Sequence, residues 1–346
     1  MTQSEAKPAP TVLPLPIHLR TPGKRTPGKS GHRMRLADLR ARFLHRRPAA
    51  TPPLEPPHES AEAALHESEP DALPEPGGAR PAGPMLRWTP ARIAIADELW
   101  GDGHLLPGGE EEVLRLAVPL GLSAASSVLL LGAGGGGAAQ AVSGGLGAWI
   151  SGHEADPALA AVAAWRLPRA GKLVAKRASV ALWDPQASVF RRRAFNHALA
   201  LEALRGAPGH PVPVPELLLA LAGALRPGGQ LMMVDLVATV RLDPNDPVVR
   251  SWAEVEGRTP DLPTEAGLSA ALTELGFDVR VTEDISTRHM RLAVQGWKRL
   301  LRNLSETRPE RLRAAAAVAE AEVWMRRLKL MRTGQIRLVR WHVIGQ

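Results

Sequence analysis

The stretch VLLLGAGGGG, residues 128–137, decides the fold. A short apolar run ends in a cluster of glycines, and a segment of helical character, residues 137–146, follows at once. An apolar run next to turn residues is typical of a buried strand. Glycines between a strand and a helix let the backbone approach a ligand closely, and the start of the helix then faces that ligand. The stretch therefore predicts a strand, a tight turn and a helix that form a binding corner.

An acid at the end of the next predicted strand strengthens this interpretation. Glu154 lies twenty residues after Gly134, where a carboxylate can accept hydrogen bonds from the ribose hydroxyls of an adenosine-containing cofactor. The glycine spacing leaves two cofactors open. Gly132, Gly134 and Gly137 fit the dinucleotide pattern G-x-G-x-x-G, whereas Gly132, Gly134 and Gly136 fit the methyltransferase pattern G-x-G-x-G.

Strands and helices alternate outward from this corner, which predicts an α/β domain over residues 85–346 with a mostly parallel sheet and helices on both faces. A helical insertion is predicted at about 289–331. The predicted strands are 128–131, 148–153, 173–176, 195–200, 229–235, 277–283 and 335–344, and the predicted helices are 90–98, 109–120, 137–146, 157–165, 215–225 and 265–275.

Residues 1–84 differ in composition from the rest of the chain and predict a disordered, Pro/Arg/Glu-rich tail. Residues 1–50 hold eleven Lys and Arg against two acids, and residues 51–85 hold seven acids against one Arg. Residues 34–47 fit a short basic amphipathic helix, which suggests contact with a membrane surface or a partner, or else a transient helix without function. We do not expect nucleic-acid binding from this pattern.

Composition also excludes several kinds of site. The chain has no cysteine, so disulfides and thiolate metal sites are absent, and no His/Asp/Glu spacing predicts another metal site. It has no tyrosine either, so no catalytic step can use a phenol. No apolar run is long enough for a membrane helix, and the start of the chain does not resemble a secretory signal. These features predict a cytoplasmic protein and leave its oligomeric state open.

Four further segments carry a resemblance to a known family. They are LWGDGHLLPGG at 99–109, LRPGGQL at 225–231, LGFDV followed by TEDIS at 275–286, and GQI at 334–336. Their order and spacing around the glycine turn resemble the class I S-adenosylmethionine (SAM)-dependent methyltransferases that act on small molecules, of the phosphoethanolamine, sarcosine/dimethylglycine and tocopherol type. The resemblance implies a Rossmann-like fold with seven strands, the last two antiparallel. A nicotinamide dehydrogenase is not expected to end in such a pair.

The resemblance also implies roles for individual residues. Glu154 would hold the ribose hydroxyls, Ala155 and Ser179 would flank the adenine, and Trp100 would lie near the transferred methyl group. The implied cofactor-binding set is completed by Gly132, Ala133, Gly134 and Gly136. Glu202, in the loop after the fourth predicted strand, and His104 are the catalytic candidates, because a base is needed when the acceptor must lose a proton.

Three features depart from the family pattern. The family has an acid after the third strand that contacts the adenine amine, whereas residues 176–179 supply none, and Asp184 further on is either its substitute or a loop cap. Leu130 and Asn196 stand where the family has acids. The leading hypothesis is a methyltransferase for a small-molecule acceptor. A catalytically decayed scaffold with an interaction role is the alternative, and an NAD(P)-dependent oxidoreductase is a third. The absence of tyrosine disfavours phosphobases as acceptors, and residues 236–331 are expected to determine acceptor specificity.

Overall fold

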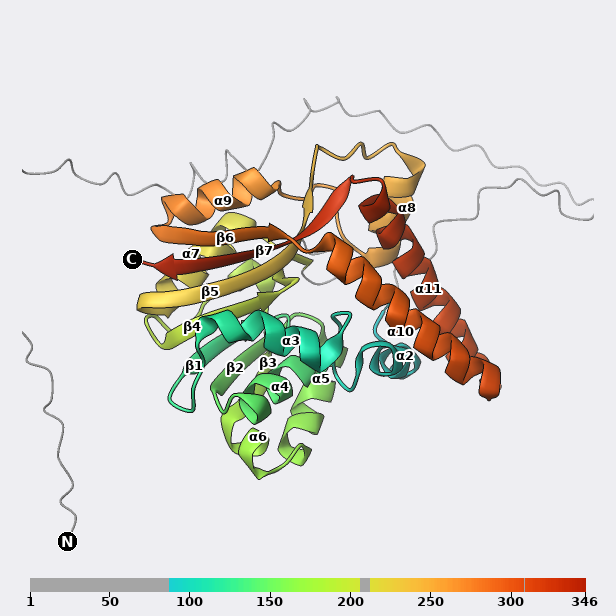
Figure 1. Ribbon diagram of the computed structural model, residues 1–346, viewed down its shortest axis with the longest axis horizontal. Helices are drawn as coiled ribbons and strands as arrows, with labels where there is room; N and C mark the ends of the chain where they lie inside the picture. Colours follow the sequence, from blue (N-terminus) through green and yellow to red (C-terminus); the bar gives the residue numbers. More distant parts are fainter. Residues whose placement is uncertain (1–86, 206–211, 308) are drawn as a thin grey trace, which may run out of the picture. The chain divides into compact units, whose positions relative to one another are not determined.

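A computed structural model describes residues 87–205, 212–307 and 309–346, which contain a seven-stranded sheet (Figure 1). The strand order is β3-β2-β1-β4-β5-β7-β6. The strands are β1 (Ser127–Leu131), β2 (Trp149–Glu154), β3 (Ala178–Leu182), β4 (Phe195–Leu201), β5 (Leu225–Ala238), β6 (Phe277–Asp284) and β7 (Ile336–Gly345).

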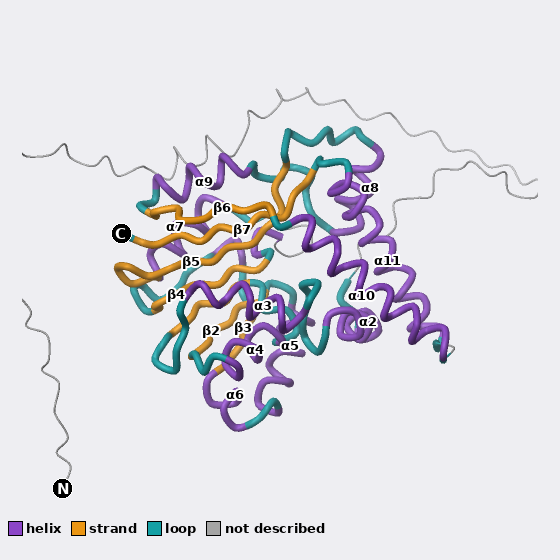
Figure 2. Tube along the Cα trace, viewed as in Figure 1, coloured by secondary structure: helices purple, strands orange, loops and turns teal. Residues whose placement is uncertain are grey.

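The first five strands are parallel, and β7 is antiparallel to both of its neighbours, β5 and β6. Figure 2 shows β7 between these two strands. The order reverses at β1, which has β2 on one side and β4 on the other. Ligands of open parallel sheets bind at such a reversal, beyond the carboxyl ends of the strands. The predicted mostly parallel sheet of seven strands with an antiparallel C-terminal pair is confirmed.

Helices cover both faces of the sheet, and the alternation of side chains along β1 shows why. Val128 and Leu130 belong to one buried cluster with α3 and α4, whereas Leu129 and Leu131 belong to another with α7 and α9. The helices are α2 (Pro90–Trp100), α3 (Gly109–Ala117), α4 (Gly137–Gly145), α5 (Pro157–Arg166), α6 (Lys172–Arg177), α7 (Val214–Ala224), α8 (Pro247–Glu256), α9 (Glu265–Glu274), α10 (Ser286–Glu306) and α11 (Arg311–Arg332).

A third buried cluster joins α2 to the long helices α10 and α11, which extend beside the sheet in Figure 1. Trp100 and Leu99 of α2 pack there with Ala293 and Leu300 of α10 and Trp324 of α11. The predicted insertion at 289–331 corresponds to these two helices. It brings the C-terminal part of the chain against α2, the first helix that the structure describes.

One strand prediction is wrong. Residues 173–176, predicted as a strand, lie in helix α6, and the third strand follows at Ala178–Leu182. A short apolar run does not distinguish a buried helical turn from a strand, and here Val174 is the buried residue of α6 while its basic residues end the helix. The correction moves the carboxyl end of β3 to Leu182, directly before Trp183. Helix α8 was not predicted at all.

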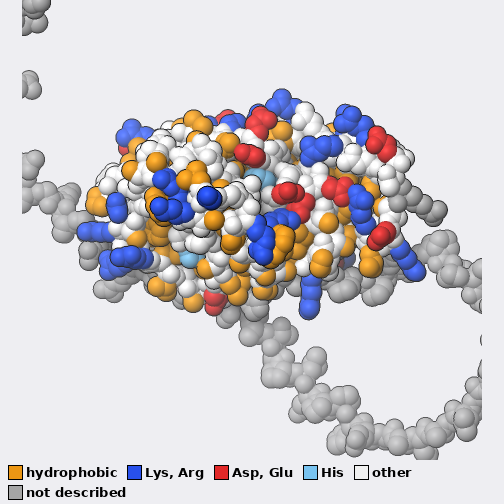
Figure 3. Space-filling view, turned by 90° about the horizontal axis from the view of Figure 1, so that it is seen from below, with side chains coloured by type: hydrophobic (Ala, Val, Ile, Leu, Met, Phe, Trp, Pro, Cys, Tyr) orange, Lys and Arg blue, Asp and Glu red, His pale blue; other side chains and the backbone are white. Residues whose placement is uncertain are grey.

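The predicted tail, the amphipathic segment 34–47 and the domain start at residue 85 lie outside the described residues. Within the described ranges, no helix is both long and apolar enough to cross a membrane. On the face shown in Figure 3, basic and acidic side chains lie among hydrophobic ones.

Candidate functional site

A pocket of about 940 Å³, open solvent included, lies at the carboxyl ends of β1, β2 and β4. Two groups of lining residues come from different parts of the fold. The glycine side, from the ends of β1, β2 and β3 and the start of α5, comprises Gly132, Ala133, Gly134, Glu154, Ala155, Asp156, Leu159 and Trp183. The arginine side, from α2, the β4 loop and α8, comprises Trp88, Arg92, Glu202, Ala203, Arg205 and Glu256.

The glycine turn after β1 requires glycine for two reasons. Gly132, Gly134 and Gly136 have φ angles of +71°, +57° and +95°, which side chains with a Cβ rarely adopt. At Gly132 a Cβ would overlap the carbonyl oxygen of Leu201 at the end of β4. The turn therefore places backbone directly at the wall of the pocket.

Glu154 ends β2 and points its carboxylate at the glycine turn. Its Oε2 accepts a hydrogen bond from the Gly134 amide at 2.7 Å, and its Oε1 accepts one from the Asp156 amide at 3.0 Å. Burial raises the pKa of this carboxyl, while the two amide hydrogen bonds oppose the shift. Each carboxylate oxygen keeps a second lone pair, so Glu154 can still accept hydroxyl groups of a ligand.

The loop between α2 and α3 covers the glycine turn. The Gly103 carbonyl accepts a hydrogen bond from the Gly137 amide at 3.1 Å, and the Gly103 amide donates to Asp97 Oδ1 at 2.8 Å. His104 follows in this loop and lines the pocket. Burial lowers its pKa to about 4, so the ring is neutral at pH 7, and its buried Nδ1 has no hydrogen-bond partner among the described residues.

The structure separates the predicted site residues into two groups. Those that line the pocket are His104, Gly132, Ala133, Gly134, Glu154, Ala155 and Glu202. Trp100, Gly136 and Ser179 do not line it. Trp100 packs on Trp324 with ring centroids 4.9 Å apart, Gly136 contacts Ala163 of α5, and Ser179 lies within β3. Their predicted roles in cofactor binding stay predictions.

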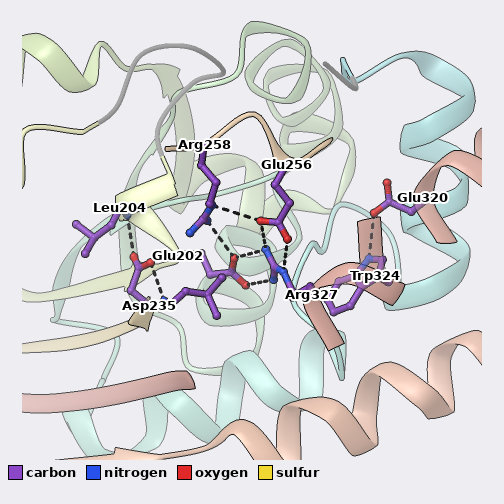
Figure 4. A network of polar contacts seen from close by, with 9 residues as sticks. Glu202, Leu204, Asp235, Glu256, Arg258, Glu320, Trp324 and Arg327 are labelled. Carbon is purple, nitrogen blue, oxygen red and sulfur yellow. Dashed lines mark hydrogen bonds and ion pairs between the residues drawn. The ribbon is translucent and has the colours of Figure 1, made fainter. Parts of the chain in front are cut away.

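Glu202 takes part in a buried ion cluster with Arg327, Glu256 and Arg258 (Figure 4). Both of its oxygens accept hydrogen bonds from Arg327 at 2.9 Å. This pairing outweighs burial and lowers the pKa of Glu202 to about 2. A carboxylate with this pKa and these bonds is a weak base, so the geometry favours a positioning role over the predicted catalytic one.

Arg327, on α11, connects the arginine side of the pocket to the C-terminal helices. It also donates to Glu256, at the end of α8, at 2.6 Å and 3.0 Å. Arg258 lies 3.3 Å from Glu256 and 3.8 Å from Glu202. These four charges are almost fully withdrawn from solvent, so each depends on the others for stabilisation.

Asp235, at the carboxyl half of β5, supports the loop that carries Glu202. Its oxygens accept hydrogen bonds from the Leu204 amide at 2.8 Å and the Leu236 amide at 2.9 Å (Figure 4). Burial raises its pKa to about 7. Asp235 does not line the pocket, so we assign it to the framework of the site.

Sequence reasoning missed several lining residues, among them Trp88, Arg92, Trp183, Arg205 and Glu256. A signal existed for Trp183 only: it follows β3 directly, but the third strand was expected too early in the chain. Trp183 is buried, and its indole nitrogen has no hydrogen-bond partner among the described residues. Tertiary packing brings the other four residues to the pocket, and no local sequence pattern predicts such packing.

No protein-family model matches the chain, and no curated protein matches it. Solved structures do. Phosphoethanolamine N-methyltransferase 2 of Haemonchus contortus, in complex with phosphomonomethylethanolamine and S-adenosylhomocysteine, matches with a TM-score of 0.62 and 16% identity over 73% of this chain and 56% of that chain. A protein of Galdieria sulphuraria assigned as a sarcosine dimethylglycine methyltransferase matches with a TM-score of 0.59 and 14% identity, over 74% and 98% of the two chains.

The [4+2]-cyclase SpnF also matches, with a TM-score of 0.55 and 17% identity over 74% of this chain and 91% of that chain. At such identities the likeness concerns the fold. It confirms the predicted Rossmann-like methyltransferase fold and, at that level, the resemblance found in the sequence. The chain spans little more than half of the Haemonchus contortus enzyme.

Proposed function

We propose that the protein is a SAM-dependent methyltransferase that acts on a small-molecule acceptor. The observation that carries the proposal is the meeting of the glycine turn and Glu154 at one wall of the pocket. The fold supports it, because solved neighbours with the same architecture are complexes with SAM or S-adenosylhomocysteine.

The residues of the glycine side fit such a cofactor. Glu154 would accept hydrogen bonds from the ribose hydroxyls, and the backbone at Gly132 and Gly134 would leave room for the ribose and methionine parts. Ala155 and Trp183 would form an apolar wall for the adenine. When bound, SAM supplies a methyl group on a sulfonium, and the protein accelerates its transfer chiefly by orienting the acceptor and excluding water.

His104 is the better of the two candidate bases. It lines the pocket, and its ring is neutral at pH 7 because burial lowers its pKa to about 4, so it can accept a hydrogen bond but holds a full positive charge poorly. Glu202 instead fixes the position of Arg327 at the arginine side. His104 is therefore proposed as the group that contacts the reacting end of the acceptor.

Two alternatives differ from this proposal, and titration with S-adenosylhomocysteine and NADH separates the first of them from it. An oxidoreductase would bind NAD(P). That class of enzyme is not expected to end in an antiparallel pair such as β6 and β7. A non-methylating role has more support, since the chain shares its fold with SpnF, a [4+2]-cyclase, and Leu130 and Asn196 replace expected acids. A cytoplasmic location stays a prediction from the sequence.

Isothermal titration with S-adenosylhomocysteine tests the proposal. We expect saturable binding to the full chain, weakened about hundredfold in Glu154→Ala because hydrogen bonds to a charged acceptor are lost. Glu154→Gln keeps the side-chain size and is expected to weaken binding about tenfold. Glu306→Gln, at an exposed position at the end of α10 and outside the pocket lining, is the matched control and should bind as the wild type does.

Absence of binding at millimolar S-adenosylhomocysteine would overturn the proposal. Binding of NADH, seen as a change in its fluorescence, would support the oxidoreductase instead. If S-adenosylhomocysteine binds and Glu154→Ala has no effect on its affinity, the cofactor lies elsewhere in the chain. Circular dichroism of each variant distinguishes loss of binding from loss of folding.

A further inference from the structure

Helix α10 extends away from the sheet and presents three lengthwise rows of residues, because positions three and four apart share one side of a helix (Figure 1). The first row is buried and consists of His289, Ala293, Gly296 and Leu300. Gly296 makes room for the Trp100 ring of α2, since a Cβ at this position would lie 2.4 Å from that ring. This close contact fixes the rotation of α10 about its own axis.

The second row is apolar and only partly covered. It consists of Met290, Val294, Trp297, Leu301 and Leu304. Val294 and Leu301 are 43% and 60% exposed, whereas the other three side chains are half-buried against the hydrophobic clusters of the domain. The apolar side of α10 is therefore wider than the contact that α10 makes with the described residues.

The third row is basic and lies on the outer side of α10. Arg291, Lys298 and Arg302 are exposed, and their side chains have no hydrogen bond or ion pair with any residue that the structure describes. The other two cations of α10 are held by groups of the domain. The helix contains five Lys and Arg but a single acid, Glu306, which is its last residue. The outward side of α10 therefore combines unpaired positive charges with an exposed apolar row.

From this combination we propose that the outward side of α10 binds the surface of an anionic membrane. The helix would lie in the plane of the interface without crossing the bilayer. Lipid phosphates would pair with the basic row, while Val294 and Leu301 reach the boundary of the acyl chains. Long Lys and Arg side chains can keep their charges at the level of the headgroups while their stems cover apolar surface.

Other occupants match this surface less well. Two copies of the chain that met through α10 would bring two basic rows together, and like charges repel. Nucleic acid offers phosphates, but its backbone provides no layer for exposed aliphatic side chains. An anionic bilayer accommodates both rows at once. The inference concerns a surface outside the pocket and does not depend on the proposed methyltransferase function.

The test must separate α10 from the N-terminal tail. Residues 1–50 hold eleven Lys and Arg, so the tail itself is attracted to anionic lipids. Variants of α10 in the full chain leave this attraction unchanged. A loss of binding in these variants therefore reports on α10.

Sedimentation with lipid vesicles at physiological ionic strength tests the proposal. We expect the full chain to bind mixed vesicles of phosphatidylglycerol and phosphatidylcholine more tightly than vesicles of phosphatidylcholine alone. Lys298→Gln combined with Arg302→Gln should weaken binding to the mixed vesicles about thirtyfold. Leu301→Ser should weaken it about tenfold, because an apolar side chain no longer enters the interface.

Matched control variants are available on α6, which precedes β3 at one edge of the sheet, whereas α10 follows β6 at the other edge. Lys172→Gln combined with Lys176→Gln removes two exposed cations, and Leu173→Ser removes a leucine that is 46% exposed. Each should bind the mixed vesicles within about twofold of the wild type, because salt screens charges that do not touch the membrane. Circular dichroism confirms that every variant is folded.

Several results would overturn the proposal. The wild type could show no preference for the mixed vesicles, or the α6 and α10 variants could weaken binding equally, which would indicate attraction by net charge alone. Binding of the α10 variants as tight as that of the wild type would assign the interaction to the tail. If duplex DNA binds more tightly than the mixed vesicles and loses affinity in the same α10 variants, the surface serves nucleic acid instead.

Discussion

The two sides of the pocket are built on different physical principles. The glycine side uses backbone amides, positive φ angles and one carboxylate, and most of it comes from a stretch of about thirty residues after β1. The arginine side uses charged side chains brought together from distant segments. Arg327 and Glu202, which hold each other at 2.9 Å, are 125 positions apart in the chain.

This difference separates what the fold provides from what the individual protein adds. Backbone geometry at a glycine turn depends on local sequence, so it suits a cofactor shared by many proteins of one fold. Buried ion pairs between α8, α11 and the β4 loop depend on tertiary packing, and they are costly to bury unless every charge is paired. They suit a wall that distinguishes one acceptor from another.

The largest effect is expected from breaking the buried cluster of the arginine side. Arg327→Met leaves Glu202 and Glu256 buried with Arg258 as their remaining ion-pair partner among the described residues, so we expect the free energy of unfolding to fall by about 3–5 kcal/mol. Arg326→Met, one position earlier, removes a partly exposed pair with Glu322 and should cost about 1 kcal/mol or less. Urea denaturation measures both.

A combined variant distinguishes loss of charge balance from loss of packing. Glu202→Gln and Glu256→Gln, added to Arg327→Met, remove the unpaired charges and should recover part of the stability. If Arg327→Met costs no more than Arg326→Met, the cluster does not stabilise the arginine side.

A somewhat smaller effect is expected from the glycine side. Gly132→Ala combines an unfavourable φ of +71° with overlap between the new Cβ and the Leu201 carbonyl, so unfolding should become easier by about 3 kcal/mol. Gly121→Ala is the matched control, because its φ is +61° and no atom lies within 4 Å of the new Cβ. It should cost about 1 kcal/mol. If Gly132→Ala and Gly121→Ala lower the free energy of unfolding equally, the backbone at Gly132 can move away from the Leu201 carbonyl without further cost.

The sequence predicted five of the eight residues of the glycine side, namely Gly132, Ala133, Gly134, Glu154 and Ala155. The apolar run, the glycines and Glu154 are close in the chain, and a strand, a turn and a helix follow from local patterns alone. Six of the seven strands were placed within a few residues of their observed bounds for the same reason. The exception is β3. The helical turn that precedes it has a similar short apolar run and was predicted as the strand, so Trp183 was not recognised as the residue that follows β3.

The arginine side could not be predicted in this way. Arg92, Arg205 and Glu256 resemble ordinary surface charges in the sequence, and nothing local shows that packing of α2, α8 and α11 buries their surroundings. Glu202 was found, but its role was predicted from its place in a loop. Its partner Arg327 lies in α11, which contains several arginines. The local sequence does not indicate which of them is buried in the folded protein.

The smallest expected effect is on the pH dependence of the free energy of unfolding, to which a buried histidine near each side of the pocket contributes. His289 of α10 is buried near Glu202 and Arg327, and burial lowers its pKa from 6.5 to about 4. A histidine with a lowered pKa in the folded state stabilises the protein above pH 6.5, and this contribution is lost as the pH falls towards 4. Wild type should therefore lose about 2 kcal/mol more than His289→Phe over this interval.

Urea denaturation at a series of pH values measures this difference, and carboxyl groups common to both proteins cancel in the comparison. His104→Phe gives the corresponding value near the glycine turn, where burial also lowers the histidine pKa to about 4. S-adenosylhomocysteine should reduce the pH dependence due to His104 more than that due to His289, because only His104 lines the pocket. Identical profiles for wild type and His289→Phe would mean that water reaches the buried ring and that the arginine side is less closed than its burial indicates.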